Sequence, residues 1–240
     1  MLRVTAPAKV NLFLGVGGLR PDGYHDVTTV LHALELHDLV EIERSTDAGP
    51  ELECDVDLGV PMTQNLAYRA ARAMGEALRR EPSVRIRVRK RIPHGAGLGG
   101  GSSDAAAVIA GLAHMWEVDP YDRRCMRAAA EMGADVPFFL ARTGAALMTG
   151  RGDRCERELA GLEGVPVAIV KPAEPVPTAL AYRRFDEGPL PPGDPAALLR
   201  ALAAGDTRAV ARRLRNNMAT VAEAIVPAVG SMASATVDRK

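Results

Sequence analysis

The stretch that decides the fold spans residues 93–103 and reads Pro93-His94-Gly95-Ala96-Gly97-Leu98-Gly99-Gly100-Gly101-Ser102-Ser103. Five of the seven positions from 95 to 101 are glycine, so the backbone can turn its N–H groups inward without Cβ clashes. We expect a helix from about Ser102 to Trp116, with Ser102 and Ser103 as its caps. A helix start adds free donors and partial positive charge. The stretch therefore predicts a cradle for an anion, most plausibly a phosphate chain.

Three other interpretations of this stretch are less favoured. The NTPase phosphate loop needs a lysine directly before the Ser or Thr, and Gly101 occupies that place. The glycine spacing does satisfy a dinucleotide-binding pattern, with Asp119 near the expected acidic position, but the preceding strand is half charged, unlike a buried parallel strand. A merely flexible loop before a capped helix is disfavoured because ordering so many glycines costs conformational entropy.

Residues 84–90 alternate strictly, with Val84, Ile86 and Val88 on one face and arginines on the other. This pattern predicts a strand of an antiparallel sheet with one solvated face. Further strands are expected at residues 2–6, 9–16, 39–43, 52–56, 143–148 and 165–170, with 52–56 pairing with 39–43. Helices are expected at 65–80 and 122–132, whereas 27–36 fits either a strand or a helix.

Composition narrows the class of protein. The 240 residues carry 30 basic and 30 acidic side chains, a formal net charge of zero, and 47% hydrophobic residues. Zero net charge disfavours a general nucleic-acid binder. No apolar run approaches the roughly 20 residues that a membrane span needs, and Arg3, Pro7 and Lys9 interrupt any secretory signal. Three widely spaced cysteines give neither a disulfide framework nor a zinc pattern. We expect a soluble cytoplasmic protein with no membrane or nucleic-acid partner.

Two further segments combine with the glycine-rich stretch to give a specific resemblance. They are Ala6-Pro7-Ala8-Lys9-Val10-Asn11-Leu12-Phe13-Leu14, with Arg20-Pro21-Asp22-Gly23-Tyr24-His25 after it, and Gly133-Ala134-Asp135-Val136-Pro137-Phe138-Phe139. The chain resembles the GHMP kinase superfamily and, more narrowly, its 4-diphosphocytidyl-2-C-methyl-D-erythritol kinases. A weaker match continues through Pro177-Thr178 and Asn216-Asn217-Met218.

The resemblance implies an α/β (α+β) fold of two domains. Residues 1–155 would form the ATP-binding domain, of the ribosomal-protein-S5 domain 2 type. Residues 156–240 would form a ferredoxin-like C-terminal domain. We expect that domain to be incomplete, because residues 229–237 only partly match the family's third glycine motif and the chain then ends.

The resemblance also implies an activity. Such kinases transfer the γ-phosphoryl of ATP, with Mg²⁺, to the 2-hydroxyl of 4-(cytidine 5'-diphospho)-2-C-methyl-D-erythritol in the non-mevalonate route to isoprenoid precursors. Asp135 matches the catalytic aspartate, and a general base needs a carboxylate within reach of the hydroxyl. Lys9 matches the catalytic lysine, whose ammonium would offset charge on the alkoxide and the transferred phosphoryl.

Binding residues follow in the same way. Asn11 lies two positions after Lys9, so on a strand both point to one face. Tyr24 and His25 would contact the cytidine, and Thr178 would lie near the substrate. Ser102 and Ser103 would touch phosphate or magnesium, and no residue is assigned as a metal ligand. The expected ATP-binding residues are Pro93, His94, Gly95, Ala96, Gly97, Leu98, Gly99, Gly100, Gly101, Ser102 and Ser103.

Two alternatives stay open at this point. One is a GHMP kinase acting on another alcohol, such as homoserine or mevalonate, which the Tyr24-His25 segment disfavours. The other is a nucleotide-binding remnant with little catalysis, favoured by the weak third motif.

Overall fold

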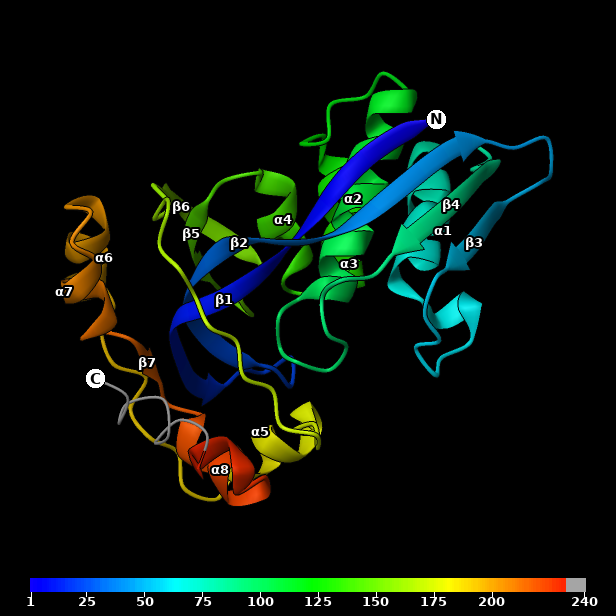
Figure 1. The fold of residues 1–240 in the computed structure, drawn as a ribbon. Helices are drawn as coiled ribbons and strands as arrows, with labels where there is room; N and C mark the ends of the chain where they lie inside the picture. The colour runs from blue at the N-terminus through cyan, green and yellow to red at the C-terminus, as the bar shows by residue number, and fades with distance from the viewer. Residues whose placement is uncertain (232–240) are drawn as a thin grey trace.

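The computed structural model describes residues 1–231. Its central feature is a long antiparallel hairpin of β1 (Leu2–Leu19) and β2 (His25–Arg44), which crosses the whole molecule (Figure 1). The sequence predicted four shorter segments in place of these two strands, and the structure corrects that prediction. Each pair is one continuous strand, and register shifts at Pro7/Lys9 and Asn11/Phe13 absorb the irregular positions. In the described chain β1 pairs at Pro7 with β2 alone, so the missing proline N–H can face an open edge.

The sheet has the strand order β3-β4-β2-β1-β7. Its other strands are β3 (Pro50–Cys54), β4 (Val84–Arg89), β5 (Ala145–Thr149), β6 (Arg154–Leu159) and the short β7 (Arg215–Asn216). β5 pairs with β2 and with β6. The predicted pairing of residues 52–56 with 39–43 is wrong. β4 lies between these two segments and pairs with β3 in parallel and with β2 antiparallel.

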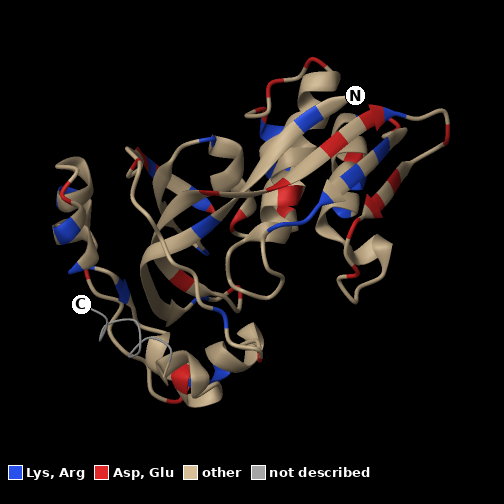
Figure 2. Ribbon diagram, in the orientation of Figure 1, with Lys and Arg blue, Asp and Glu red and all other residues tan. Residues whose placement is uncertain are grey.

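The predicted alternation of β4 is confirmed. Val84, Ile86 and Val88 are buried, whereas the arginines form ion pairs with acidic residues of the neighbouring strands. In Figure 2, basic positions of β4 lie beside acidic positions of β3. Arg85 Nε lies 3.0 Å from Glu51 Oε2 on β3. Exposed pairs of this kind contribute little net stability, but opposite charges directly across a strand pair favour the observed register.

Helices cover the buried face of this part of the sheet. They are α1 (Leu66–Leu78) with the 3₁₀ turn η1 (Met62–Gln64) before it, α2 (Gly100–Met115), α3 (Arg123–Met132) and α4 (Val136–Ala141). The main core joins α1, α2 and α3 to strand residues such as Ile42 and Ile86. Alanines dominate the α2 side of this core, so α2 packs close to its neighbours; a Cβ at Gly111 would lie 2.5 Å from Ile42 Cδ1.

The start of α2 differs from expectation. Gly99 is the N-cap residue, with a left-handed backbone (φ 72°), and the helix begins at Gly100. The sequence placed the start at Ser102 with two serine caps, which is wrong. Both serines lie inside the helical turn, and no side chain caps this helix. Glycine alone adopts the left-handed cap without steric cost, so the glycine-rich stretch itself sets the helix start.

The second half of the chain wraps the other end of the hairpin with α5 (Thr178–Asp186), α6 (Ala196–Ala203), α7 (Thr207–Ala211) and α8 (Ala219–Ile225) (Figure 1). Small clusters around Phe13 and Phe185 join it to β1 and β2. The buried side chain of Asn217 accepts from the Val16 N–H and donates to the Val16 carbonyl, both at 2.9 Å. That amide therefore replaces a strand neighbour for β1.

The strand predicted at residues 165–170 is wrong. The segment has no regular structure, and Val165, Val167, Ile169 and Val170 are exposed. A run of β-branched residues forms a strand only where another strand supplies hydrogen bonds, and within residues 1–231 none pairs with this segment.

Three remaining expectations have different outcomes. Most of the partial third motif (229–237) lies outside the described residues, and the domain boundary after residue 155 stays a prediction. In the described part of the chain, no helix is long and apolar enough to cross a bilayer.

Candidate active site

Lys9 and Asp135, far apart in the sequence, meet in the structure. Lys9 lies on β1 with a side chain only 9% exposed, and its Nζ is 3.4 Å from Asp135 Oδ2. Asp135 is the N-cap residue of α4, yet its side chain accepts no capping hydrogen bond from that helix. The carboxylate is thus not used as a cap, and a third of its side-chain surface stays open to solvent. It can accept a proton from a bound molecule.

A chain of hydrogen bonds fixes the ammonium of Lys9. Lys9 Nζ donates to Asn11 Oδ1 at 2.8 Å, and Asn11 Nδ2 donates to Thr29 Oγ1 at 2.8 Å. The Thr29 hydroxyl in turn donates to the Phe13 carbonyl at 2.6 Å. The predicted shared face of Lys9 and Asn11 is confirmed. Thr29 was missed, because a threonine in a β-branched strand segment carries no signal of its own.

The glycine-rich segment approaches the same point. The Lys9 N–H donates to the Leu98 carbonyl at 2.9 Å. A Cβ at Gly99 would lie 3.0 Å from both Lys9 Cγ and Phe139 Cζ, so only glycine lets the backbone come this close. Gly95, Gly97 and Gly99 all have left-handed backbones, with φ of 66°, 71° and 72°. The segment 93–99 therefore ends directly beside the Lys9–Asp135 pair.

The start of α2 has an unsatisfied polar group. Ser103 is 1% exposed, and its Oγ has no hydrogen-bond partner among the described residues. A buried hydroxyl without a partner costs free energy, so the site is suited to a bound acceptor or cation. No three His, Cys, Asp or Glu side chains of residues 1–231 gather into a metal site.

Comparison with known proteins identifies the family. Residues 65–142 match the model of the GHMP kinases N terminal domain. A 4-diphosphocytidyl-2-C-methyl-D-erythritol kinase of Pelotomaculum thermopropionicum is 39% identical over 97% of this chain and 80% of its own length. A crystal structure of 4-(cytidine 5'-diphospho)-2C-methyl-D-erythritol kinase matches with TM-score 0.72 and 35% identity, over 96% of this chain and 81% of that one.

The chain belongs to the 4-diphosphocytidyl-2-C-methyl-D-erythritol kinase family. It is a small-molecule kinase of the GHMP type, and kinases of this family use ATP. A homoserine kinase of Cytophaga hutchinsonii shares the fold, with TM-score 0.63 at 15% identity, over 99% of this chain and 78% of that one. That likeness concerns the fold alone.

A second polar centre of this GHMP kinase surrounds His25. His25 is 8% exposed, and its Nε2 lies 2.7 Å from Asp186 Oδ1 at the end of α5. The Tyr182 ring lies 5.0 Å from the imidazole, centroid to centroid. Burial raises the pKa of the Tyr182 phenol, and the negative charge of Asp135 raises it further, so α5 brings this ring within electrostatic range of the Lys9–Asp135 pair. Sequence reasoning missed both Tyr182 and Asp186, since nothing in the sequence places α5 against β2.

Thr178 begins α5, one turn before Tyr182, and is exposed. Residues four apart share a helix face, so Thr178 lies on the side of α5 that carries Tyr182. The segment leading into α5 also reaches the glycine-rich segment, because a Cβ at Gly95 would lie 3.8 Å from Pro175 Cβ. The structure thus brings the segment before Thr178 beside the glycine-rich segment, while the role of Thr178 stays a prediction.

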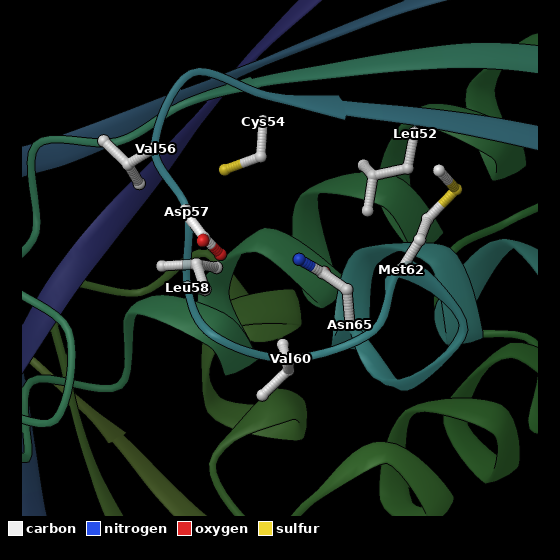
Figure 3. A pocket seen from close by; sticks show the side chains of 8 residues that line it. All are labelled: Leu52, Cys54, Val56, Asp57, Leu58, Val60, Met62 and Asn65. Carbon is white, nitrogen blue, oxygen red and sulfur yellow. The ribbon is translucent and has the colours of Figure 1, made fainter.

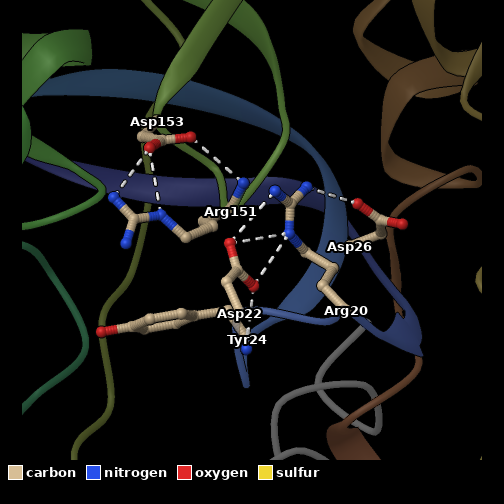
Figure 4. Close-up of polar contacts among 6 residues, drawn as sticks. All are labelled: Arg20, Asp22, Tyr24, Asp26, Arg151 and Asp153. Carbon is tan, nitrogen blue, oxygen red and sulfur yellow. Dashed lines mark hydrogen bonds and ion pairs between the residues drawn. The ribbon is translucent and has the colours of Figure 1, made fainter.

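Tyr24 lies in the turn of the β1–β2 hairpin and is 55% exposed. The guanidinium of Arg151 lies over its ring, 4.7 Å from the centroid (Figure 4). Asp153 holds Arg151 through bonds of 3.1 and 3.2 Å to one carboxylate oxygen, and Asp22 accepts the Tyr24 N–H at 3.2 Å. Arg151 thus covers one face of the ring, while much of the Tyr24 side chain stays exposed. Arg151 was not predicted.

The kinase also has a cavity beside the start of α1, between the end of β3 and the connection that follows it. Its volume is about 160 Å³. The side chains of Asp57 and Asn65 point into the cavity, and its other lining side chains are apolar (Figure 3). The lining residues are Leu52, Cys54, Val56, Asp57, Leu58, Val60, Met62 and Asn65. This cavity was not predicted, because half of its lining residues belong to the irregular connection between β3 and η1.

Proposed function

We propose that this kinase transfers the γ-phosphoryl of ATP to the 2-hydroxyl of 4-(cytidine 5'-diphospho)-2-C-methyl-D-erythritol. The observation that carries the proposal is the 3.4 Å approach of Lys9 Nζ to Asp135 Oδ2 beside the glycine-rich segment. The printed names of the relatives supply the substrate. A base, a cation and a phosphate cradle at one point are the parts that phosphoryl transfer requires.

In the reaction the substrate hydroxyl oxygen forms a bond to the γ-phosphorus, and the bond from that phosphorus to the β,γ-bridging oxygen breaks. ADP leaves with the bridging oxygen. Asp135 accepts the hydroxyl proton, and its partly open carboxylate supports this role. Lys9, fixed by Asn11, faces the negative charge that develops on the oxygens of the transferred group.

The backbone N–H groups of residues 94–103 would bind the ATP phosphates, and Pro93 would flank them. Left-handed glycines and the uncapped start of the 16-residue helix α2 support this role, because both leave amide donors free. The cavity beside Asn65 would take the adenine, since a flat base needs apolar walls and a few polar groups. Mg²⁺ is usually held by substrate phosphates, waters and few protein oxygens. The unpartnered Ser103 hydroxyl fits such a site, where the ion would neutralise phosphate charge.

The cytidine end of the substrate would bind across the turn of the hairpin and α5. His25, with its orientation fixed by Asp186, offers a ring nitrogen edge, and Tyr24 and Tyr182 offer aromatic faces. Asn11 and Thr178 would hold the methylerythritol part near Asp135. This arrangement disfavours homoserine or mevalonate, which carry no base to stack.

The decisive experiment combines the full-length chain with ATP, Mg²⁺ and the cytidine-linked substrate, and follows the product by mass spectrometry. We expect one added phosphoryl group at the 2-hydroxyl and at least 100-fold lower kcat/KM with homoserine or mevalonate. Preferred turnover of either alcohol would reject the assigned substrate. ATP binding by calorimetry with no turnover of any of the three would support the remnant alternative instead.

A further inference from the structure

A buried ion cluster lies just behind the glycine-rich segment, outside the site described above. Lys90 follows β4, and its Nζ lies 2.5 Å from Asp38 Oδ2 and 2.6 Å from Asp104 Oδ2. The side chains of Lys90, Asp38 and Asp104 are 7%, 0% and 5% exposed. They come from the end of β4, from β2 and from α2, so the ammonium joins three separate elements.

The cluster holds both ends of the glycine-rich segment. At its start, Asp38 Oδ1 accepts the backbone N–H groups of Arg91 and Ile92, the latter at 2.8 Å, directly before Pro93. At its end, Asp104 lies in the second turn of α2, five residues after Gly99. Lys90 bonds to both carboxylates. One ammonium therefore fixes the distance between the last strand residues before the segment and the first turns of the helix after it.

Stability alone does not account for this cluster. Two carboxylates share one ammonium, and Asp104 Oδ1 has no partner among the described residues. Burial raises the pKa of Asp104 to about 7, although Lys90 acts to lower it. Burial by itself would lower the pKa of Lys90, but the charges of Asp104 and Asp38 offset this and raise it. Buried ionic groups are often no more stabilising than apolar residues of the same volume.

A role in positioning the glycine-rich segment accounts for a buried ion cluster that adds little net stability. A segment rich in glycine loses much conformational entropy when it becomes ordered. If that entropy were lost only on ligand binding, affinity would fall accordingly. Fixing the two ends in the free protein lowers the cost of ordering the residues between them.

We propose that Lys90, with Asp38 and Asp104, is a positioning clasp that holds residues 93–99 in the shape that receives the ATP phosphates. The clasp touches no substrate itself and acts through the backbone of the segment. The inference rests on the proposed function, since it presumes that the segment binds ATP.

The test compares two variants. Lys90→Met removes the ammonium and leaves two buried carboxylates. Lys90→Met/Asp104→Leu also removes one carboxylate and should recover thermal stability, while the link between the two ends stays broken. Arg85→Met is the matched control, because Arg85 makes an ion pair on the solvated face of β4, the strand that Lys90 follows.

We expect both clasp variants to raise KM for ATP, and the Kd of a non-hydrolysable ATP analogue in calorimetry, at least tenfold. KM for the cytidine-linked substrate should change less than twofold, and kcat less than threefold. In the ATP-free protein, amide hydrogen exchange of residues 95–99 should be at least tenfold faster. Arg85→Met should match the unaltered protein throughout.

Two results would overturn the proposal, and both can be distinguished from a result that overturns the proposed function. If the double variant recovers both stability and ATP affinity, the cluster serves stability alone. If Lys90→Met folds and binds the analogue normally, there is no clasp. Should Lys90→Met fail to fold, the affinity of the double variant for the ATP analogue decides: normal affinity overturns the proposal, and affinity at least tenfold weaker supports it. If the unaltered protein binds no ATP analogue, the proposed function itself falls and takes the clasp with it.

Discussion

Asn11 links Lys9 to the interior of the sheet: its Oδ1 accepts from Lys9 Nζ and its Nδ2 donates to Thr29 Oγ1, both at 2.8 Å. An amide can do both at once because it carries an acceptor and donors on the same group. The position of the Lys9 ammonium, and with it the distance to Asp135, therefore depends on a hydroxyl that touches neither residue.

Replacing the base should abolish chemistry while the fold survives. For Asp135→Asn we expect kcat to fall by about 10²–10⁴-fold, because the amide cannot accept the hydroxyl proton. Both KM values should change little, and the melting temperature should hold, since the side chain makes no capping bond. Steady-state kinetics and thermal unfolding measure this. Glu131→Gln, an exposed carboxylate on α3, is the control and should leave kcat unchanged; near-normal turnover by Asp135→Asn would remove Asp135 from the mechanism.

The hydrogen-bond chain behind Lys9 can be tested at its far end. Thr29→Val keeps the side-chain shape but leaves the Asn11 amide and the Phe13 carbonyl without their partner. We expect a loss of about 1–3 kcal/mol in unfolding free energy and a kcat reduced by about tenfold, the size of a 1.4 kcal/mol rise in the barrier. Thr28→Val is the matched control on the same strand. Equal kcat in the two variants would mean that the chain does not position Lys9.

The His25 centre should govern the cytidine-linked substrate and not ATP. For His25→Ala and for Asp186→Asn we expect KM for that substrate to rise, by about tenfold or more for a lost buried polar contact, with KM for ATP unchanged. Asp186→Asn should have the smaller effect, because it alters only the orientation and charge of the partner of His25 Nε2. An equal rise in both KM values, measured by varying each substrate in turn, would contradict this assignment.

Two glycines of the glycine-rich segment allow a paired test of how closely its backbone approaches Lys9 and Phe139. Gly97 and Gly99 have almost the same backbone, with φ of 71° and 72°. Gly97→Ala should cost about 1–2 kcal/mol for the left-handed backbone alone, because a Cβ there meets nothing within 4 Å. Gly99→Ala should cost more, since its Cβ would press on Lys9 and Phe139 at 3.0 Å. Urea unfolding compares them, and equal losses would show that the contact is absent in solution.

The raised pKa of Asp104 predicts a pH dependence of stability. Burial raises the pKa of this carboxyl to about 7 in the folded protein, whereas in the unfolded chain it loses its proton near its ordinary pKa of 3.8. Folding therefore favours the protonated form, and stability from this group is present below about pH 4 and falls as pH rises to about 7, by up to about 1.4 kcal/mol per unit. The difference in unfolding free energy between Asp104→Asn and the unaltered protein should shift in favour of the variant over this range.

The control for that pH dependence is a carboxyl with the opposite shift. The Arg124 side chain and backbone N–H hold the pKa of Asp122 at about 2, so its contribution is present above the unfolded value and is lost as pH falls toward 2. Asp122→Asn should therefore leave the slope between pH 5 and 7 unchanged. A flat profile for Asp104→Asn relative to the unaltered protein would mean that Asp104 is ionised throughout this range.

The sequence by itself determined what depends on neighbours along the chain. The alternation of residues 84–90 specified β4 and its solvated face, and the apolar spacing of residues 65–80 specified α1, because side-chain direction follows from local backbone geometry. The glycine-rich stretch indicated a phosphate cradle for the same local reason: glycine alone permits those backbone angles.

Tertiary structure decided what depends on partners distant in the chain. Residues 165–170 are a short run of apolar, mostly β-branched residues, which favours a strand, but no strand of the described chain pairs with them. The sequence could name Lys9 and Asp135 by resemblance, but only the packing of β1 and α4 against Gly99 brings them to 3.4 Å. The same holds for Tyr182 beside His25 and for Lys90 between its two carboxylates. Such contacts arise from long-range burial, which no local pattern encodes.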